Sequence, residues 1–257
     1  MEGWQAFILG IVEGLTEFLP VSSTFHLIFA SQLMGIKNTE FLKMFEVFIQ
    51  AGSILAVLIL YIKELIGDKQ LIKKTIFSFI PTVIIGFLLY PIIKNVFFES
   101  KALMLSAFII FGLVFLIYEQ WQGKGTPKKK TLEQISYADS WLIGIGQALA
   151  IIPGVSRSGI VILVMMFLGY KRDQAAKYSF FLALPTILAA ASLDIFKVQV
   201  QTPLLSSEIQ ALVIGFVSAL LVALLVLRWL INFLQKNTLL SFGYYRIILG
   251  LFLIWLI

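Results

Sequence analysis

The sequence predicts an all-α protein that crosses a membrane several times. Of its 257 residues, 60% are hydrophobic and only 13% are charged, whereas a soluble domain carries about a quarter charged residues. Several apolar runs are long enough to cross a hydrocarbon layer of roughly 30 Å. No segment is long or polar enough to form a second domain, so we expect a single membrane domain over residues 1–257.

Six apolar stretches have the length and composition of complete transmembrane helices. They are residues 41–62, 75–94, 102–118, 174–194, 208–229 and 241–257.

Composition also excludes several functions. The chain has no cysteine, so neither disulfides nor thiolate metal sites are available. Its net charge is +6, but the lysines lie between the apolar runs, as membrane topology requires, and we expect no nucleic-acid partner. The first residues contain Glu2 and no basic cluster, so we expect no cleavable signal.

Two further apolar stretches are interrupted and cannot span the membrane as single helices. Residues 4–34 are broken at Leu19-Pro20, and residues 140–169 are broken at Pro153-Gly154. A broken helix is tolerated at membrane depth only where protein or a water-filled cavity surrounds it. We therefore predict two re-entrant helical hairpins.

The two hairpins are related by an internal repeat. A shift of 134 residues places Ser22 on Ser156, Gly35 on Gly169 and Glu13 on Gln147. The repeat unit, about 1–120 and about 135–257, is one hairpin followed by three spans. An odd number of spans inverts the second copy, so the hairpins enter from opposite faces and meet near the midplane, as in many transporter folds.

The basic residues predict the orientation of the chain. In this layout one face receives Lys63, Lys69, Lys73, Lys74, Lys124, Lys128, Lys129, Lys130, Lys171, Arg172, Arg228 and Lys236. The other face receives Lys37, Lys43, Lys94, Lys101 and Lys197. Because cytoplasmic loops carry the excess of basic residues, we expect the first face to be cytoplasmic, with both termini and the open side of the first hairpin outward.

The first hairpin carries a pair of glutamates. Glu13 and Glu17 are four residues apart and share one face of a helix. Two adjacent carboxylates in a membrane repel each other and are costly to desolvate, and a divalent cation relieves both problems. Oxygen ligands suit Mg²⁺ or Ca²⁺. We expect both glutamates to bind such a cation; the alternative is a pair of acids at a wet helix end.

Hydroxyl groups and a histidine follow the break. Ser22, Ser23 and Thr24 lie around the first turn of a new helix, whose free N–H groups and dipole favour an anion. Ser22 is expected mainly as the N-cap and Ser23 as a functional residue. Ser23 and His26, the chain's one histidine, lie three apart and share a face. A histidine can act as base or nucleophile near neutral pH.

The second hairpin carries an arginine. Arg157 lies between Ser156 and Ser158, where a helix restarts, and an arginine in mid-membrane needs an anionic partner. The planar guanidinium group of Arg157 can donate two hydrogen bonds to the oxygens of a phosphate, which is the partner we expect. The alternative is a buried ion pair with Glu13 or Glu17 and no ligand.

Other polar residues carry weaker signals. Gln50 and Ser53 can line a cavity or simply pack. Lys177 is expected to snorkel to the cytoplasmic surface. Arg246, near the outer face, is expected to touch lipid headgroups.

The motifs from Glu13 to His26 and from Pro153 to Ser158, preceded by Gly146-Gln147, resemble the undecaprenyl-diphosphatase family, also called bacitracin-resistance proteins. The resemblance covers the whole chain. It implies a bacterial inner-membrane enzyme that opens outward and recycles the lipid carrier of peptidoglycan precursors. It also implies a polyprenyl diphosphate lipid substrate.

The resemblance assigns roles to the motif residues. The family's motif residues match Glu13, Glu17, Ser23, His26 and Arg157. We expect Glu17, Ser23, His26 and Arg157 to be catalytic and Glu13 and Glu17 to bind metal. From their positions we also expect substrate binding by Ser22, Thr24, Gln50, Gln147, Ser156 and Ser158. Three residues depart from the family pattern. Phe25 stands in place of glycine, Val161 in place of threonine and Lys177 in place of an acid. Phe25 is expected to crowd the headgroup, and Val161 to remove a phosphate donor.

The hypothesis is an in-line attack by Ser23 with His26 as base; His26 or water as nucleophile stays open. A lipid-phosphate transporter or flippase and a weakly active paralogue on the same fold are the alternatives. The sequence also leaves open whether the chain forms a homodimer.

Overall fold

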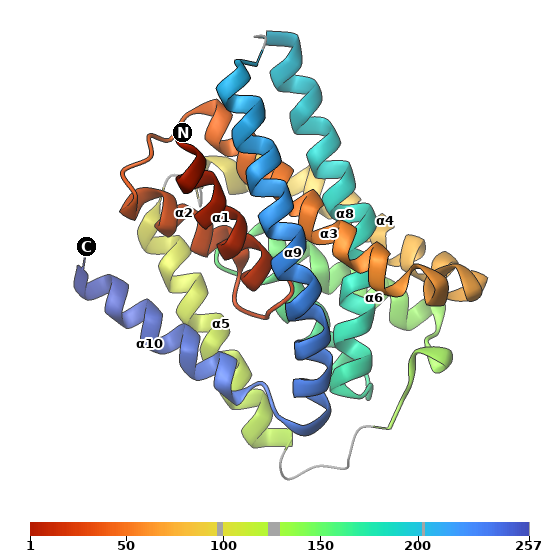
Figure 1. Ribbon diagram of the computed structural model, residues 1–257. Helices are drawn as coiled ribbons and strands as arrows, with labels where there is room; N and C mark the ends of the chain where they lie inside the picture. Colours follow the sequence, from red (N-terminus) through yellow and green to blue (C-terminus); the bar gives the residue numbers. More distant parts are fainter. Residues whose placement is uncertain (97–99, 123–128, 202–203, 257) are drawn as a thin grey trace.

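The computed structural model describes residues 1–96, 100–122, 129–201 and 204–256, and the side chains of 90–96, 191–201 and 256 are left aside. The described chain is helical, with one isolated bridge between Lys130 and Tyr170 as its only strand-like pairing (Figure 1). The all-α prediction is therefore confirmed.

The described residues of the first half of the chain form five α-helices. They are α1 Gly3–Thr16, α2 Ser23–Leu33, α3 Glu40–Gly67, α4 Lys69–Val96 and α5 Lys101–Gln122. Helix α3 begins after Thr39, whose side chain accepts a hydrogen bond from the N–H of Leu42. Such an N-cap satisfies a donor that has no partner inside the helix.

In the second half, the part of the chain that the structure describes forms five α-helices and two short 3₁₀ helices. They are η1 Leu132–Gln134, α6 Tyr137–Ala148, η2 Leu149–Ile151, α7 Arg157–Phe167, α8 Arg172–Gln201, α9 Ser206–Lys236 and α10 Leu240–Leu256. Ser136 caps α6 by accepting from the N–H of Asp139 at 2.9 Å.

Both predicted breaks occur. Leu19-Pro20 lies between α1 and α2, and Pro153-Gly154 lies between η2 and α7. Helix α2 begins at Ser23 and α7 begins at Arg157, 134 positions later, and both have 11 residues.

Long helices match four of the six predicted spans. In the described part of the chain α3, α4 up to Leu89, α5 and α9 are long and apolar enough to cross a membrane. Predicted spans 174–194 and 241–257 lie in α8 and α10, outside that set. Residue 257 and the side chains of 90–94, 191–194 and 256 lie outside the description.

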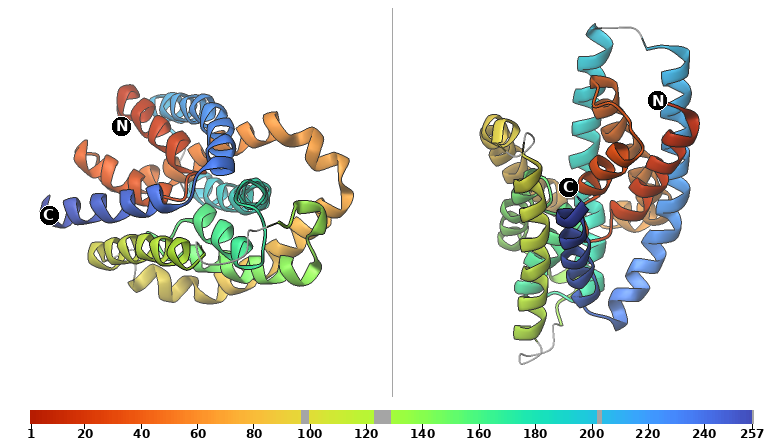
Figure 2. Two further views of the ribbon diagram at one scale, coloured as in Figure 1. Left: turned by 90° about the horizontal axis from the view of Figure 1, so that it is seen from below. Right: turned by 90° about the vertical axis from the view of Figure 1, so that its left-hand side faces the viewer.

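Helices α1, α3, α4 and α5 of the first half each pack against a helix of the second half, and the contact of α1 with α9 corresponds to that of α6 with α4. Helix α1 lies along α9, and α6 lies along α4; α3 contacts α8, and α5 contacts α10. The further views show α5 and α10 side by side at one flank of the molecule (Figure 2).

Small residues allow the closest of these approaches. A Cβ added to Gly10 would lie 2.5 Å from the carbonyl oxygen of Gly215 on α9. A Cβ added to Gly144 would lie 1.9 Å from the carbonyl oxygen of Ser78 on α4. Backbones this close leave no room for a side chain, so glycine is required at both positions.

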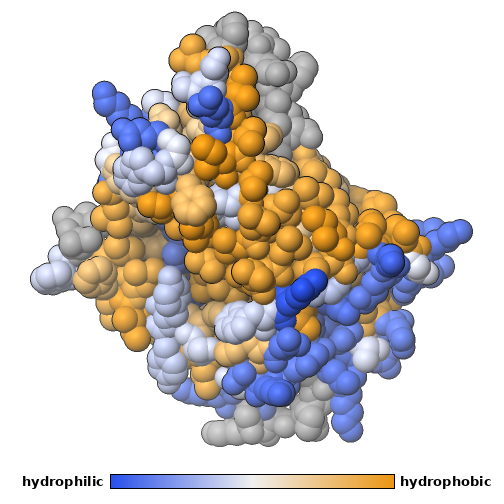
Figure 3. Space-filling view, viewed as in Figure 1, coloured by the Kyte–Doolittle hydropathy of each residue, from blue (hydrophilic) through white to orange (hydrophobic). Residues whose placement is uncertain are grey.

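The outer surface is largely apolar. On the face in Figure 3 hydrophobic residues cover most of the molecule, and hydrophilic residues gather at the lower right. Exposed side chains of α9, including Val213, Val217, Leu221 and Leu225, contribute to the apolar surface. Exposed apolar area of this extent is the property of a surface that faces lipid.

Candidate active site

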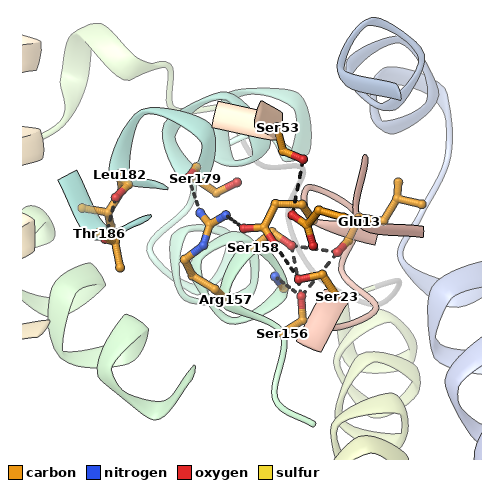
Figure 4. A network of polar contacts seen from close by, with 12 residues as sticks. Glu13, Ser23, Ser53, Ser156, Arg157, Ser158, Ser179, Leu182 and Thr186 are labelled. Carbon is orange, nitrogen blue, oxygen red and sulfur yellow. Dashed lines mark hydrogen bonds and ion pairs between the residues drawn. The ribbon is translucent and has the colours of Figure 1, made fainter. Parts of the chain in front are cut away.

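The segment between α1 and α2 lies against the start of α7. The carbonyl of Leu19 accepts from the hydroxyls of Ser158, at 2.9 Å, and Ser156, at 3.4 Å. Ser156 is also the N-cap of α7, because its Oγ accepts from the N–H of Gly159 at 3.1 Å. The two breaks of the chain therefore meet (Figure 4).

Glu17 and Arg157 form a buried ion pair between the two breaks. Arg157 Nη2 donates to Glu17 Oε1 at 2.7 Å, and Nη1 donates to the carbonyl of Ser179 on α8 at 3.0 Å. The exposed fractions of the side chains are 12% for Arg157 and 6% for Glu17. The ion pair considered as the alternative partner of Arg157 is thus present.

Ser23 is bound to the same carboxylate. Its Oγ donates to Glu17 Oε2 at 2.5 Å, while the other oxygen of Glu17 accepts from Arg157. Glu17 therefore orients Ser23 and is itself held by Arg157. A carboxylate in this position can accept the hydroxyl proton when the oxygen attacks an electrophile.

Glu13 lies one helical turn before Glu17. Its Oε1 accepts from Ser53 on α3 at 3.3 Å, and its Oε2 has no hydrogen-bond partner although it is buried. Glu13 and Glu17 lie four residues apart at the C-terminal end of α1, so their side chains share a face of the helix. A buried carboxylate oxygen without a donor is costly and calls for a ligand.

The glutamate pair fits a divalent cation. Among the described residues no cluster of three or more His, Cys, Asp or Glu side chains occurs that could hold a metal by itself. Mg²⁺ is commonly bound by one or two carboxylates together with substrate phosphates and water. The unpartnered Oε2 of Glu13 beside Glu17 meets that requirement.

A cavity of about 270 Å³ opens beside the ion pair. Eight of the predicted site residues border it: Glu17, Ser22, Ser23, Thr24, Gln50, Gln147, Ser156 and Arg157. Its remaining wall is mainly small or apolar and includes Gly86, Ala148, Ala150, Ile151, Val155, Ile187 and Ala190. Polar groups thus converge on one side of an otherwise apolar cavity, which suits an amphiphile with an anionic head.

Residues 6–252 match the model of the family described as bacitracin resistance protein BacA. The chain belongs to this family. It is 44% identical over 251 residues to the undecaprenyl-diphosphatase of Aquifex aeolicus, covering 98% of this chain and 97% of the relative. It is 44% identical to that of Campylobacter fetus over the full length of both chains, and 46% identical to that of Persephonella marina over 96% and 95% of the two.

Two of the departures from the BacA family pattern lie away from the cavity. Phe25 is buried and stacks on Phe108 of α5, with 3.7 Å between ring centroids. It points into the core because α5 packs behind α2, so the expected crowding of the headgroup was wrong. Val161 is fully buried in the core and does not border the cavity.

Lys177, the third departure, forms an ion pair. Its Nζ lies 3.0 Å from Glu64 Oε1, and it lies 5.7 Å from the ring centroid of Tyr61 on the same helix as Glu64. The prediction of a snorkelling side chain missed this partner, because the docking of α8 on α3 is not visible in local sequence.

His26 does not contact Ser23. Its Nδ1 lies 2.7 Å from the carbonyl oxygen of Ser22, and its Nε2 lies 2.7 Å from the hydroxyl of Tyr245 on α10. The predicted pairing of Ser23 with His26 was therefore wrong in this structure. Helical spacing put both residues near one face, but Glu17 binds the hydroxyl and α10 binds the ring.

Ser22 is at the N-cap position without acting as a cap. Its side chain makes no capping hydrogen bond, and its backbone has φ 68° and ψ 93°. Among the described residues it is the only non-glycine residue with positive φ. The expected capping role was wrong, because this backbone conformation is not the extended one from which an N-cap side chain reaches the N–H groups of the first turn.

Arg246 was expected to touch lipid headgroups and is instead completely buried. Its guanidinium donates to the carbonyls of Phe108 at 3.0 Å, Pro20 at 3.3 Å and Gly154 at 2.5 Å. Pro20 and Gly154 are the residues at the two breaks. The rule that an intramembrane arginine marks a functional site would have identified it.

The sequence analysis also missed two threonines. Gln147 Nε2 donates to Thr82 on α4 at 3.0 Å and to Thr186 on α8 at 3.2 Å, and both threonines border the cavity. Isolated threonines in apolar helices belong to no motif, so the sequence carried no signal for them.

Proposed function

We propose that this chain hydrolyses undecaprenyl diphosphate to undecaprenyl phosphate and phosphate, and so recycles the lipid carrier of peptidoglycan precursors. Membership of the BacA family and the naming of its relatives as undecaprenyl-diphosphatases support this proposal. The observation that carries it is the arrangement of Ser23, Glu17 and Arg157 at the edge of one cavity. A nucleophile, a proton acceptor and a phosphate-binding fork lie together there.

We infer that the cavity opens to the outer face of the bacterial inner membrane. The basic residues at the α3–α4 junction, Lys63, Lys69, Lys73 and Lys74, and at the start of α8, Lys171 and Arg172, support a cytoplasmic position for those ends. Both termini would then lie outward. The predicted orientation also used Lys94, Lys124, Lys128 and Lys197, whose side chains the structure does not describe.

We also propose the finer architecture of six spans and two re-entrant hairpins in a single domain. The matching lengths and 134-residue offset of α2 and α7, and the corresponding pairs α1 with α9 and α6 with α4, support inverted repeats over about 1–120 and about 135–257. An inverted repeat would bring the helix N-termini of both hairpins to one midplane site.

In the proposed reaction the chain first binds the headgroup. Arg157 and the N-terminus of α7 bind the terminal phosphate, and Gln147, Gln50 and the hydroxyls of Ser22, Thr24 and Ser156 provide further polar contacts. Ser158, also predicted to bind substrate, does not border the cavity and donates to the carbonyl of Leu19. The apolar cavity wall receives the start of the prenyl chain. A divalent cation, Mg²⁺ or Ca²⁺, bound by Glu13 and Glu17 would supply positive charge that offsets the charge of the diphosphate.

Ser23 then attacks the terminal phosphorus. The Oγ–phosphorus bond forms as the bond from that phosphorus to the bridging oxygen breaks, and Glu17 takes the hydroxyl proton. Undecaprenyl phosphate leaves with the bridging oxygen. Water then cleaves the phosphoserine and releases phosphate. The 2.5 Å contact between Ser23 and Glu17 favours this route over proton transfer to His26.

Phosphate release from undecaprenyl diphosphate by purified protein tests this function. We expect release with Mg²⁺ or Ca²⁺, none with EDTA, and a loss of at least about 10³-fold in Glu17→Gln and Ser23→Ala. Glu133→Gln, at an exposed glutamate of η1, serves as the control with unchanged release. An active Ser23→Ala variant would contradict the covalent route and favour water as nucleophile.

A lipid-phosphate flippase is the second candidate, and the corresponding helix pairs favour it, because inverted repeats are a transport architecture. Movement of a fluorescent lipid phosphate across vesicles, without phosphate release, would support it. The third alternative, a weakly active paralogue, depended on Phe25 and Val161, neither of which borders the cavity. The mass of the purified particle tests the homodimer.

A further inference from the structure

A chain of contacts connects α10 to the residue before Ser23. The hydroxyl of Tyr245 lies 2.7 Å from His26 Nε2, and His26 Nδ1 lies 2.7 Å from the carbonyl oxygen of Ser22. The rings of Tyr245 and His26 are nearly parallel, at 8°, with 5.7 Å between centroids. None of the proposed chemical steps uses Tyr245.

The partners fix the tautomer of His26. A carbonyl oxygen can only accept, so Nδ1 must carry the proton that bonds to Ser22. In the neutral ring Nε2 is then the acceptor, and the Tyr245 hydroxyl donates to it. The lone pair that a general base would use is thus occupied by Tyr245, and His26 is absent from the cavity wall.

The carbonyl that His26 binds belongs to the strained residue. Ser22 has a φ of 68°, a region that a residue with a Cβ adopts only when its surroundings impose it. The hydrogen bond from His26 is one such restraint. The next residue is Ser23, so the direction of its Oγ toward Glu17 depends on this turn.

The neighbouring residue on α10 acts on the same segment. Arg246 donates to the carbonyl of Pro20 at 3.3 Å, two residues before Ser22. Helix α10 therefore holds the turn at two points, through Arg246 directly and through Tyr245 by way of His26.

We propose that Tyr245 is a positioning residue for the reaction: through His26 it holds the Ser22 backbone and thereby aims the Ser23 hydroxyl at Glu17. The proposal rests on the proposed function. It makes His26 a structural link in this turn and leaves proton transfer from Ser23 to Glu17.

Two substitutions of His26 separate this role from that of a base. Asparagine is short and keeps an N–H donor near the position of Nδ1, whereas glutamine places its amide near Nε2. Asparagine is too short to reach Tyr245, so we expect His26→Asn to lose about 5- to 10-fold, as in Tyr245→Phe. We expect His26→Gln, which loses the donor to Ser22, to lose about 30- to 100-fold. Equal losses of about 10³-fold or more in both variants would show that His26 transfers protons and would overturn the proposal.

Tyr245→Phe removes only the hydroxyl. We expect kcat to fall about 5- to 10-fold with KM changed less than about twofold, because Tyr245 does not border the cavity that receives the headgroup in the proposed reaction. Tyr244→Phe is the matched control, since Tyr244 is the adjacent, exposed tyrosine of α10, and its rate should not change. An unchanged rate in Tyr245→Phe would contradict the proposal.

The chain has a single histidine, so ¹⁵N-histidine labelling reports on His26 alone. In detergent without substrate we expect a protonated Nδ1 and an unprotonated Nε2, with a mixture of tautomers in Tyr245→Phe. This spectrum needs no turnover. A wild-type chain that is active but has its proton on Nε2 would overturn this inference alone, whereas a chain with the expected spectrum and no phosphate release would overturn the proposed function.

Discussion

Glu17 and Arg157 are 140 positions apart in the chain and share a buried ion pair of 2.7 Å. One residue comes from the first break and the other from the second, so neither half of the chain holds the charged site alone. Arg157 also borders the cavity, so a phosphate in the cavity can reach its guanidinium while the ion pair is present.

Arg157→Lys tests whether the site needs the two separate N–H donors of the Arg157 guanidinium. Arginine donates at once to Glu17 and to the carbonyl of Ser179, and lysine offers a single ammonium group. We expect a loss of transition-state stabilisation of about 2–3 kcal/mol, which is roughly 30- to 200-fold in kcat/KM. Phosphate release measures it. Lys177→Arg, at the ion pair with Glu64, is the control, and equal losses in both variants would contradict a specific role for Arg157.

Glu13→Gln tests the metal site without turnover. If a cation binds the unpartnered Oε2 of Glu13, Mg²⁺ should raise the melting temperature of the wild-type protein in detergent. The variant should need at least about tenfold more Mg²⁺ for the same shift. Glu46→Gln replaces another buried glutamate with an unpartnered oxygen and should respond like the wild type. Identical titrations in Glu13→Gln and wild type would exclude Glu13 as a ligand.

Arg246→Gln tests the link between the two breaks. The substitution leaves the carbonyls of Pro20 and Gly154 without their buried donor, at a cost of about 3–5 kcal/mol for the whole network. We expect a lower melting temperature and a loss of activity together. Arg228→Gln, at an exposed position of α9, should change stability by less than about 0.5 kcal/mol. A stable Arg246→Gln variant would show that the breaks hold each other without it.

Gly10→Ala and Gly144→Ala test the two corresponding helix contacts. Each Cβ would approach a neighbouring backbone oxygen to 2.5 Å or less, so the helices must separate. We expect each substitution to cost about 2 kcal/mol or more, measured as thermal stability. Gly86→Ala has no atom within 4 Å of its added Cβ and should stabilise α4 by up to about 1 kcal/mol. Equal effects at all three positions would contradict the packing described for Gly10 and Gly144.

Sequence was sufficient where the determinant is local. Leu19-Pro20 and Pro153-Gly154 break helices in any context, and the starts of α2 and α7 followed from them. Arg157 needed an anionic partner, and the ion pair with Glu13 or Glu17 that was considered as the alternative to phosphate is the one present, with Glu17. The 134-residue repeat also predicted that the two hairpins meet, and their breaks lie against each other.

Sequence failed where the partner depends on how remote helices dock. Helical spacing placed Ser23 near His26, but it could not show that Glu17 lies closer or that Tyr245 of α10 binds the ring. For Arg246, depth in the membrane was estimated from position along the chain, whereas its burial depends on α5 packing beside α10. The direction in which a side chain points from a membrane-spanning helix can be assigned only when the tertiary contacts of that helix are known.

The hydrogen bond from Arg246 to Pro20 joins residues 226 positions apart. During synthesis on the ribosome the first break is therefore made long before the guanidinium that holds it, and the helices between them must be inserted in the interval. Until α10 arrives, the Pro20 and Gly154 carbonyls lack this donor. The nascent chain would thus complete this turn only once α10 has been inserted.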